Sequence, residues 1–267
     1  MNAKALPDIG RFYAALKSSH EYDNTEVLPK VKAIDSPTER QHCFIAGYYR
    51  ALATVRSLLR LDDPSHFQAI ASLARTLFEL AIDLRLIGLV DGAIRKIYAF
   101  AELERLRSAE KMVAFGKGFG ATEDLSVYKA FIADKKGSIE QACQTFWPNL
   151  KLKTLKHWSL LSVAQQAEAA GSLFAEMYHV NYKPLSWQVH SGLAGVMNLE
   201  KDAFPMMCGI ALKIAVDCYA DVLDATIVEF NFGAADRRLR QKLQLAVMLP
   251  FTDSEREAVA LQKELLS

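Results

Sequence analysis

Residues that interrupt helices are scarce in this sequence, with 13 glycines and 8 prolines among 267 residues. Apolar and polar residues nowhere alternate for more than a few positions, which argues against half-buried β-strands. The hydrophobic content of 51% is sufficient for a large core. We therefore predict an all-α fold, a bundle of roughly seven to nine helices joined by short loops.

Paired cysteines and long apolar runs are also missing. The N-terminal residues Met1–Asp8 contain no apolar signal region, and no run reaches the length needed to span a membrane. The four cysteines form no Cys-x-x-Cys pair, and most fall within apolar helical patterns, where a thiol behaves as a small hydrophobe. They are Cys43, Cys143, Cys208 and Cys218. These absences predict a cytoplasmic protein with reduced cysteines and no membrane association.

The chain has no excess of charge of either sign. Its 32 Lys and Arg nearly balance its 31 Asp and Glu, so the net charge of +1 lacks the basic excess of a general nucleic-acid binder. This balance does not exclude a local basic patch, and nucleic acid stays open as a partner. The one dense basic run, 237–242, is typical of a solvated helix face.

Capping signals divide the chain into expected helices. Ser36-Pro37-Thr38-Glu39 combines an N-cap serine, a first-turn proline and a capping-box glutamate. A second capping box, Ser-Val-Ala-Gln, begins at Ser162. The expected helices lie near 36–61, 63–89, 92–115, 123–134, 138–146, 162–182 and 203–232, where 231–233 ends the last, and two amphipathic helices follow, the final one headed by 252–255.

No linker rich in Gly and Ser, internal repeat or low-complexity tract divides the chain. We predict a single domain over 1–267, with 40–232 as its core and 233–267 as C-terminal helices. The span 116–161 is the most irregular, which favours a small inserted subdomain there.

The expected helix 67–89 is apolar around most of its circumference but carries a narrow polar stripe. Arg75, Glu79 and Asp83 follow one another at a spacing of four, so they share one face. If the stripe faces solvent, an ion pair on it contributes only a few tenths of a kcal/mol. If it faces other helices, its charges must be paired or their pKa values shift.

A second polar face lies on the apolar helix 203–232. Its charged members are Lys213, Asp217, Asp221 and Asp224. An exposed acidic face costs little, whereas an inward one requires a cation, supplied by Lys213, Arg75, Arg85 or a metal. The sequence leaves both arrangements open.

Sixteen residues that begin at Tyr178 contain the densest set of reactive groups. Tyr178, Tyr182, Ser186 and His190 recur at a spacing of four, and Pro184 predicts a helix break or bend among them. His190 would act as a general base, or as a donor to a phosphate or carboxylate. The alternative is a structural histidine bonded to Tyr178, Tyr182 or a carboxylate of another helix.

Two Glu-x-x-His units match part of a carboxylate-bridged di-metal site, which also requires two further carboxylates. The candidate ligands are Glu39, His42, Glu176, His179, Glu79 and Glu229. A capping role for Glu39 at a helix start argues against this site.

Arg60-Leu-Asp-Asp-Pro-Ser-His66 resembles the Arg-x(4–6)-His spacing of a superfamily of helical ribonucleases. A spacing this permissive is expected about once by chance in a chain of this composition, and Leu61 stands where the superfamily has a polar residue. The glycine-rich segment 116–120 follows an expected helix rather than a strand, so it lacks the context of a phosphate loop. No nucleophile elbow or zincin helix occurs.

Three segments form a set that is more specific together than singly. They are Arg75-Thr-Leu-Phe-Glu79-Leu, His157-Trp158-Ser159 and, after Tyr182, Leu185-Ser186-x-x-x-His190-Ser-Gly192. In this set the chain resembles, over about residues 40–230, a widespread bacterial family of uncharacterised all-helical proteins. The resemblance implies that the residues of the first and third segments are neighbours in the fold. It implies no particular reaction.

Two classes of function remain. In a binding or regulatory module, Arg75, Glu79 and His190 would form a buried polar network that fixes helix packing. In a phosphate-directed enzyme, such as an RNA-cleaving stress or phage-defence protein, Arg75 would stabilise phosphate charge and His190 would transfer a proton. The candidate catalytic residues are His190, Arg75 and Glu79, and the candidate ligand-binding residues are Tyr182, Ser186 and Tyr178.

We expect no metal or cofactor, and a homodimer is compatible with the many apolar helices.

Overall fold

The computed structural model describes residues 8–119, 124–190 and 203–266, apart from the side chains of 117–119, 187–190 and 234. Within these ranges the regular structure is helical, with no strand, so the predicted all-α class is confirmed. The chain divides into two compact units: unit 1 comprises 1–85 and 163–267, and unit 2 comprises 86–162. The expected subdomain at 116–161 falls within unit 2. The single domain over the whole chain stays a prediction.

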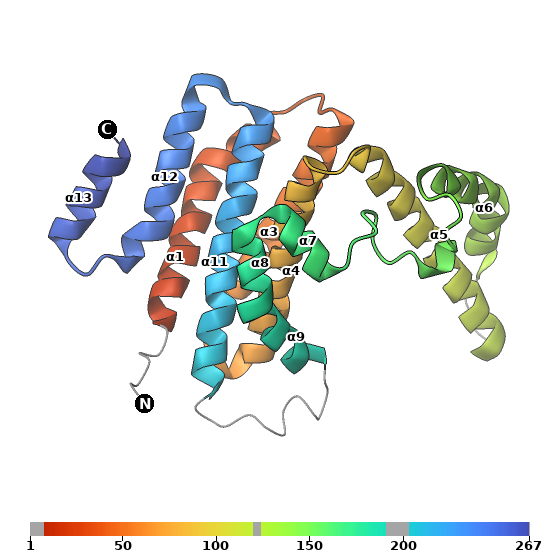
Figure 1. Cartoon of the computed structure of the whole chain (residues 1–267), viewed down its shortest axis with the longest axis horizontal. Coiled ribbons are helices and arrows are strands. Elements are labelled where there is room, and N and C mark those ends of the chain that lie inside the picture. The colour runs from red at the N-terminus through yellow and green to blue at the C-terminus, as the bar shows by residue number, and fades with distance from the viewer. Residues whose placement is uncertain (1–7, 120–123, 191–202, 267) are drawn as a thin grey trace. The chain divides into compact units, whose positions relative to one another are not determined.

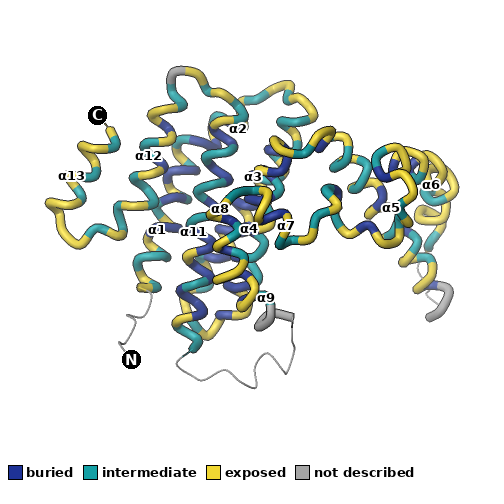
Figure 2. The backbone as a smooth tube through the Cα atoms, in the orientation of Figure 1, coloured by how far each residue is buried: buried dark blue, intermediate teal, exposed yellow. Residues whose placement is uncertain are grey.

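Unit 1 is built around α11 (Ala203–Phe230), the long apolar helix predicted from the sequence. The helices α1 (Ile9–Tyr22), α3 (Glu39–Leu58) and α12 (Asp236–Met248) pack against it (Figure 1). Buried residues follow α11 along most of its length, whereas the outer faces of its neighbours are exposed (Figure 2). The helix ends at the expected place, where Asn231 (φ +45°) and Gly233 (φ +72°) adopt the left-handed conformation that closes helices.

The start of α3 differs from the expected cap. Thr38, not Ser36, is the N-cap: its hydroxyl accepts from the backbone N–H of Gln41, and the Gln41 side chain accepts from the Thr38 N–H. The reciprocal capping box therefore lies two residues further along, and Glu39 is the first helical residue. The prediction placed the cap before Pro37 because a proline suits the first helical turn.

A continuous run of helix precedes α3. The α1 helix passes into a π-helical segment, η1 (Asp23–Val27), and then into α2 (Leu28–Lys32). After α3, a short 3-10 turn, η2 (Pro64–His66), leads into α4 (Phe67–Ile87), as the Asp63-Pro64 signal predicted.

The predicted single helix over 162–182 is wrong. The segment forms α7 (Val163–Ala170), α8 (Ser172–Glu176), a π-helical segment η4 (Met177–Tyr182) and α9 (Lys183–His190). Gly171 separates the first two because its φ of +122° is incompatible with a continuous helix. Pro184 does not end the helix either: it is the second residue of α9, directly after the π-helical turn, where the wider winding accommodates the missing N–H.

Unit 2 contains two long helices that pack against each other, and a short turn. Its elements are α5 (Ala93–Phe119), α6 (Ser126–Phe146) and the 3-10 turn η3 (Leu152–Thr154). The two short helices predicted near 123–134 and 138–146 are one helix, α6, which continues through Gly137. That glycine costs about 1 kcal/mol relative to alanine, and the packing of α6 against α5 outweighs the cost.

The end of unit 1 is formed by η5 (Gly233–Ala235), α12, η6 (Leu249–Phe251) and α13 (Glu255–Leu266). Ser254 caps α13 by accepting from the N–H of Glu257. None of the described helices combines the length and the apolar character needed to cross a membrane.

Candidate functional site

The polar stripe of α4 places two of the predicted site residues on one face. Arg75 and Glu79 are one turn apart, and the guanidinium Nη2 lies 3.5 Å from the Glu79 Oε1. The same helix also contributes to the core, with Ala74, Leu77 and Phe78 fully buried. The stripe is neither wholly exposed nor wholly sealed, because the Arg75 side chain is 13% exposed and the Glu79 side chain 48%.

Tyr182, the last residue of the π-helical segment η4, joins these two side chains. Its hydroxyl donates to Glu79 Oε1 at 2.6 Å and accepts from Arg75 Nη2 at 3.0 Å. The Arg75 guanidinium carbon also lies 5.0 Å from the centre of the Tyr182 ring. Phe78 packs beside that ring at 4.7 Å between centres. Tyr182 thus forms one contact network with Arg75 and Glu79, although it lies more than one hundred positions further along the chain.

The electrostatics of this network keep the phenol protonated. Tyr182 is almost fully buried. Burial and the hydrogen bond to Glu79 raise the pKa of Tyr182 to about 12, while the hydrogen bond from Arg75 opposes the rise. At neutral pH the hydroxyl is therefore a neutral donor to the Glu79 carboxylate rather than a base.

The remaining predicted residues are Tyr178, Ser186 and His190. Tyr178 stacks on Tyr182 with ring centres 5.4 Å apart. Ser186 is half-buried on the first turn of α9. His190 ends α9, but its side chain lies outside the described residues, so a contact between His190 and Arg75 stays a prediction.

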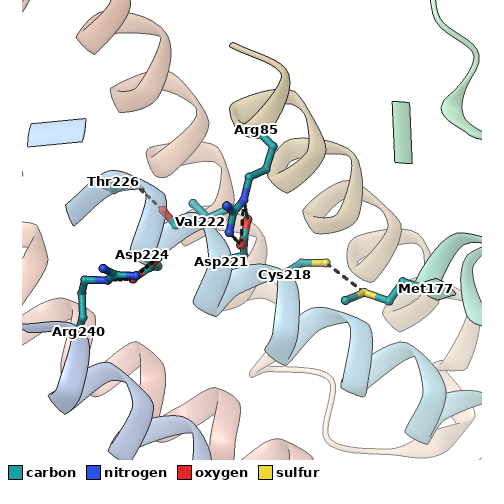
Figure 3. A network of polar contacts seen from close by, with 8 residues as sticks. All are labelled: Arg85, Met177, Cys218, Asp221, Val222, Asp224, Thr226 and Arg240. Carbon is teal, nitrogen blue, oxygen red and sulfur yellow. Dashed lines mark hydrogen bonds and ion pairs between the residues drawn. The ribbon is translucent and has the colours of Figure 1, made fainter. Parts of the chain in front are cut away.

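Each aspartate on the acidic face of α11 pairs with a cation, and two of these cations come from other helices (Figure 3). Arg85 binds Asp221 through two nitrogens, with Nε 3.1 Å from Oδ2. Arg240 binds Asp224 through Nε and Nη2, at 2.5 and 3.1 Å. Lys213 pairs along the helix with Asp217 at 2.6 Å. Asp221 and Asp224 are therefore half-buried carboxylates paired with arginines of other helices, an arrangement between the two expected ones, and no metal is needed to explain them.

Arg240 belongs to the basic run 237–242, which was expected to be a solvated helix face. Arg237 and Arg238 are exposed as expected, but Arg240 pairs with Asp224 and Lys242 with Glu26. The run thus serves partly to attach α12 to neighbouring segments.

The same part of α11 also holds a buried thiol. Cys218 Sγ lies 3.9 Å from the Met177 sulfur, and burial raises the pKa of this thiol well above its usual value (Figure 3). Cys218 is therefore a core residue without reactive thiolate character.

The residues proposed for a di-metal site serve other contacts. The Arg40 Nε donates a bifurcated hydrogen bond to both carboxylate oxygens of Glu229, at 2.8 and 3.0 Å. The His179 Nε2 lies 3.8 Å from the Glu168 Oε1. Among the described residues no group of three or more His, Cys, Asp and Glu side chains is placed to hold a metal ion.

The Arg60 and His66 pair of the ribonuclease-like spacing is exposed on either side of a turn. His66 ends the 3-10 turn η2, and Asp63 stabilises that turn by accepting from the Ser65 N–H at 2.7 Å. The spacing is explained by the turn that connects α3 to α4.

A second polar cluster of unit 1 was not predicted. Asp23, the first residue of the π-helical segment η1, is fully buried. Tyr48 of α3 donates to its Oδ1 at 2.6 Å, and Tyr219 of α11 donates to its Oδ2 at 2.7 Å. Burial raises the pKa of the Asp23 carboxyl, and the two tyrosine hydrogen bonds oppose that rise. One carboxylate thus connects three helical segments.

A sequence signal for this cluster exists. Asp23 follows Leu16 by seven residues and Ser19 by four, so it continues the buried stripe of α1. An acidic residue on an apolar stripe indicates a buried carboxylate that requires donors. Tyr48 and Tyr219 occupy equivalent apolar positions on their own helices.

In unit 2, the His157-Trp158-Ser159 motif forms a turn. The His157 Nδ1 lies 2.7 Å from the Ser159 Oγ, which also accepts from the Leu161 N–H at 3.3 Å. Trp158 is buried. The motif therefore stabilises an irregular segment of unit 2.

Comparison with known proteins agrees with the resemblance found in the sequence. The family described as "Family of unknown function (DUF5677)" matches residues 41–203, which is more than half of the chain. The chain belongs to this family. The matched range takes in all of unit 2 and, in unit 1, both α4 and the segment from α7 to α9. No curated protein and no solved structure matches the chain.

Proposed function

We propose that the protein is a helical binding or regulatory module in which Arg75, Tyr182 and Glu79 fix the segment from α8 to α9 on α4. The observation that carries this proposal is the Tyr182 hydroxyl, which is buried and has both a donor and an acceptor partner. A buried hydroxyl that is hydrogen-bonded to two side chains of another helix favours one arrangement of the two segments.

The contacts of Arg75 argue against a phosphate-binding role in this arrangement. A guanidinium that stabilises phosphate must reach the substrate, whereas Arg75 is mostly buried and contacts Tyr182 and Glu79. The phosphate-directed enzyme, including an RNA-cleaving defence protein, would require Arg75 to leave these partners. The binding or regulatory function requires no such movement.

The test is the stability of variants that remove single groups of the network. Tyr182→Phe deletes only the hydroxyl, so we expect the free energy of unfolding to fall by about 1–2 kcal/mol. Tyr178→Phe is the matched control, since the Tyr178 hydroxyl has no hydrogen bond within the described residues; we expect a change below about 0.5 kcal/mol. Chemical denaturation of both variants measures the difference.

The same variants distinguish the two classes of function. Arg75→Ala and His190→Ala should be screened by thermal shift with metals, nucleotides and short RNAs, and in an RNA-cleavage assay. Arg75→Ala that lowers the melting temperature, with no cleavage by the wild type, supports the module. Loss of a wild-type cleavage activity at unchanged melting temperature would contradict it and establish the enzyme.

A further inference from the structure

The two units carry opposite net charges. Unit 2 contains twelve Lys and Arg against eight Asp and Glu, which gives +4, whereas unit 1 contains 20 against 23, which gives −3. The whole-chain value of +1 is the sum of these two and conceals both. The basic excess is therefore confined to one compact unit, where it can attract an anionic ligand although the whole chain is nearly neutral.

Part of this excess lies in one short segment. No Asp or Glu occurs between Glu140 and Glu168, and Lys151, Lys153 and Lys156 fall within that interval. All three lysines are exposed. Among the ion pairs of the described residues, none involves these three lysines, although Lys135 and Lys136 of the same unit have carboxylate partners. The segment 151–157, which we call the lysine turn, therefore presents uncompensated positive charge.

The lysine turn is held in place by a buried framework. Arg107 of α5 donates to the backbone carbonyls of Leu152 and Leu155, the latter at 2.8 Å. Leu155 is itself buried, and Trp158 is buried directly after the turn. Since the backbone that carries the lysines is held in place, little backbone entropy is lost when they bind a ligand.

The half-buried His157 ring follows the lysine turn and packs against two aromatic rings. It lies 6.3 Å from the Phe100 ring and 5.3 Å from the Trp158 ring, and its Nδ1 is engaged by Ser159. The segment His157-Trp158-Ser159 thus follows the three lysines directly, and its hydrogen bonds stabilise the end of the turn.

We propose that the lysine turn binds the phosphate backbone of a nucleic acid. Lysine ammonium groups bind phosphates as point charges, without the planar fit of arginine, which suits a contact that is independent of base sequence. Three closely spaced cations on a fixed segment match a polymer with one negative charge per nucleotide. This site is separate from Arg75, Tyr182 and Glu79, so it goes beyond the module proposed above and can fail without it.

The test uses the full chain and a fluorescent single-stranded RNA of mixed sequence in an anisotropy titration. The variant Lys151→Gln/Lys153→Gln/Lys156→Gln removes three charges from the turn. We expect its Kd to rise roughly tenfold at low salt, and the slope of log affinity against log salt to become shallower by about 2. The melting temperature should not change, because the three side chains are exposed.

A matched control removes the same charge from unit 1. Lys17, Lys32 and Lys263 are also exposed, and none of them takes part in an ion pair within the described residues. Lys17→Gln/Lys32→Gln/Lys263→Gln should bind the RNA within about twofold of the wild type, since the contact is local rather than a response to net charge.

Three results would overturn the proposal. They are a wild type that binds no RNA at low salt, equal weakening by the two triple variants, and displacement of the RNA by polyglutamate at equal charge concentration. The last result would assign the lysine turn to an acidic protein partner instead. Each is distinguishable from failure of the proposed module, which is measured by the stability of Tyr182→Phe.

Discussion

In unit 1, charged side chains meet partners from other helices. Arg85 binds Asp221, Arg240 binds Asp224, and the buried Asp23 accepts from two tyrosines. In unit 2, the best-anchored cation, Arg107, bonds to backbone carbonyls, and the lysines of the turn it holds are exposed. Polar groups in unit 1 therefore contribute to packing, whereas those in the lysine turn remain available to a ligand. The net charge of the whole chain does not distinguish charged groups that contribute to packing from those that are available to a ligand.

The largest expected effect comes from removing the buried carboxylate of unit 1. Asp23→Ala leaves the hydroxyls of Tyr48 and Tyr219 buried without an acceptor, so we expect the free energy of unfolding to fall by about 3 kcal/mol. Lys153→Ala on the lysine turn is the comparison and should change it by less than about 0.5 kcal/mol. Urea denaturation measures both. Similar losses from the two substitutions would remove the contrast between the units.

An intermediate effect is expected from the cation that anchors the lysine turn. Arg107→Met retains the aliphatic packing but removes the donors to two carbonyls, which should cost about 1–2 kcal/mol. Arg95→Met, at an exposed position on the same helix, is the control and should be near neutral. Proteolysis within 150–161 should accelerate only in the Arg107 variant. Unchanged proteolysis would show that Arg107 does not hold the turn.

The smallest expected effect is a pH dependence centred on Asp23. Because burial raises the pKa of this carboxyl in the folded state, the folded protein binds the proton more tightly than the unfolded chain. The contribution of Asp23 is therefore fully present below the unfolded pKa of about 4 and is lost as pH rises through the folded value. As the pH rises through the folded pKa of Asp23, the free energy of unfolding of the wild type should therefore fall relative to that of Asp23→Asn. Parallel profiles of the two proteins between about pH 4 and 7 would contradict a raised pKa.

The long helices of unit 1 could be predicted because their sequences are strongly periodic. The apolar run of α11 and its end at Asn231 and Gly233 follow from residue type alone. Arg75 and Glu79 were identified by their spacing on an otherwise apolar helix, and Tyr182 by its position in a second spaced row. That Tyr182 contacts both depends on how η4 packs on α4, which no local pattern contains.

The failures have a common physical cause. Gly137 resembles a helix break, but packing of α6 on α5 overrides that local preference. Pro184 predicts a break, but a π-helical turn precedes it and the chain continues as α9. Asp23 was passed over because an isolated acidic residue is usually on the surface, and its two donors come from distant helices. In each case a neighbouring part of the structure, rather than the residue type alone, decides the outcome.

The most direct test of the structural role of the Arg75, Tyr182 and Glu79 network is a double-mutant cycle on Tyr182→Phe and Glu79→Gln, measured as free energies of unfolding. The 2.6 Å hydrogen bond between these side chains predicts a coupling energy of about 1 kcal/mol. Additive losses, with a coupling within about 0.3 kcal/mol of zero, would contradict the claim that this network fixes α9 and η4 on α4.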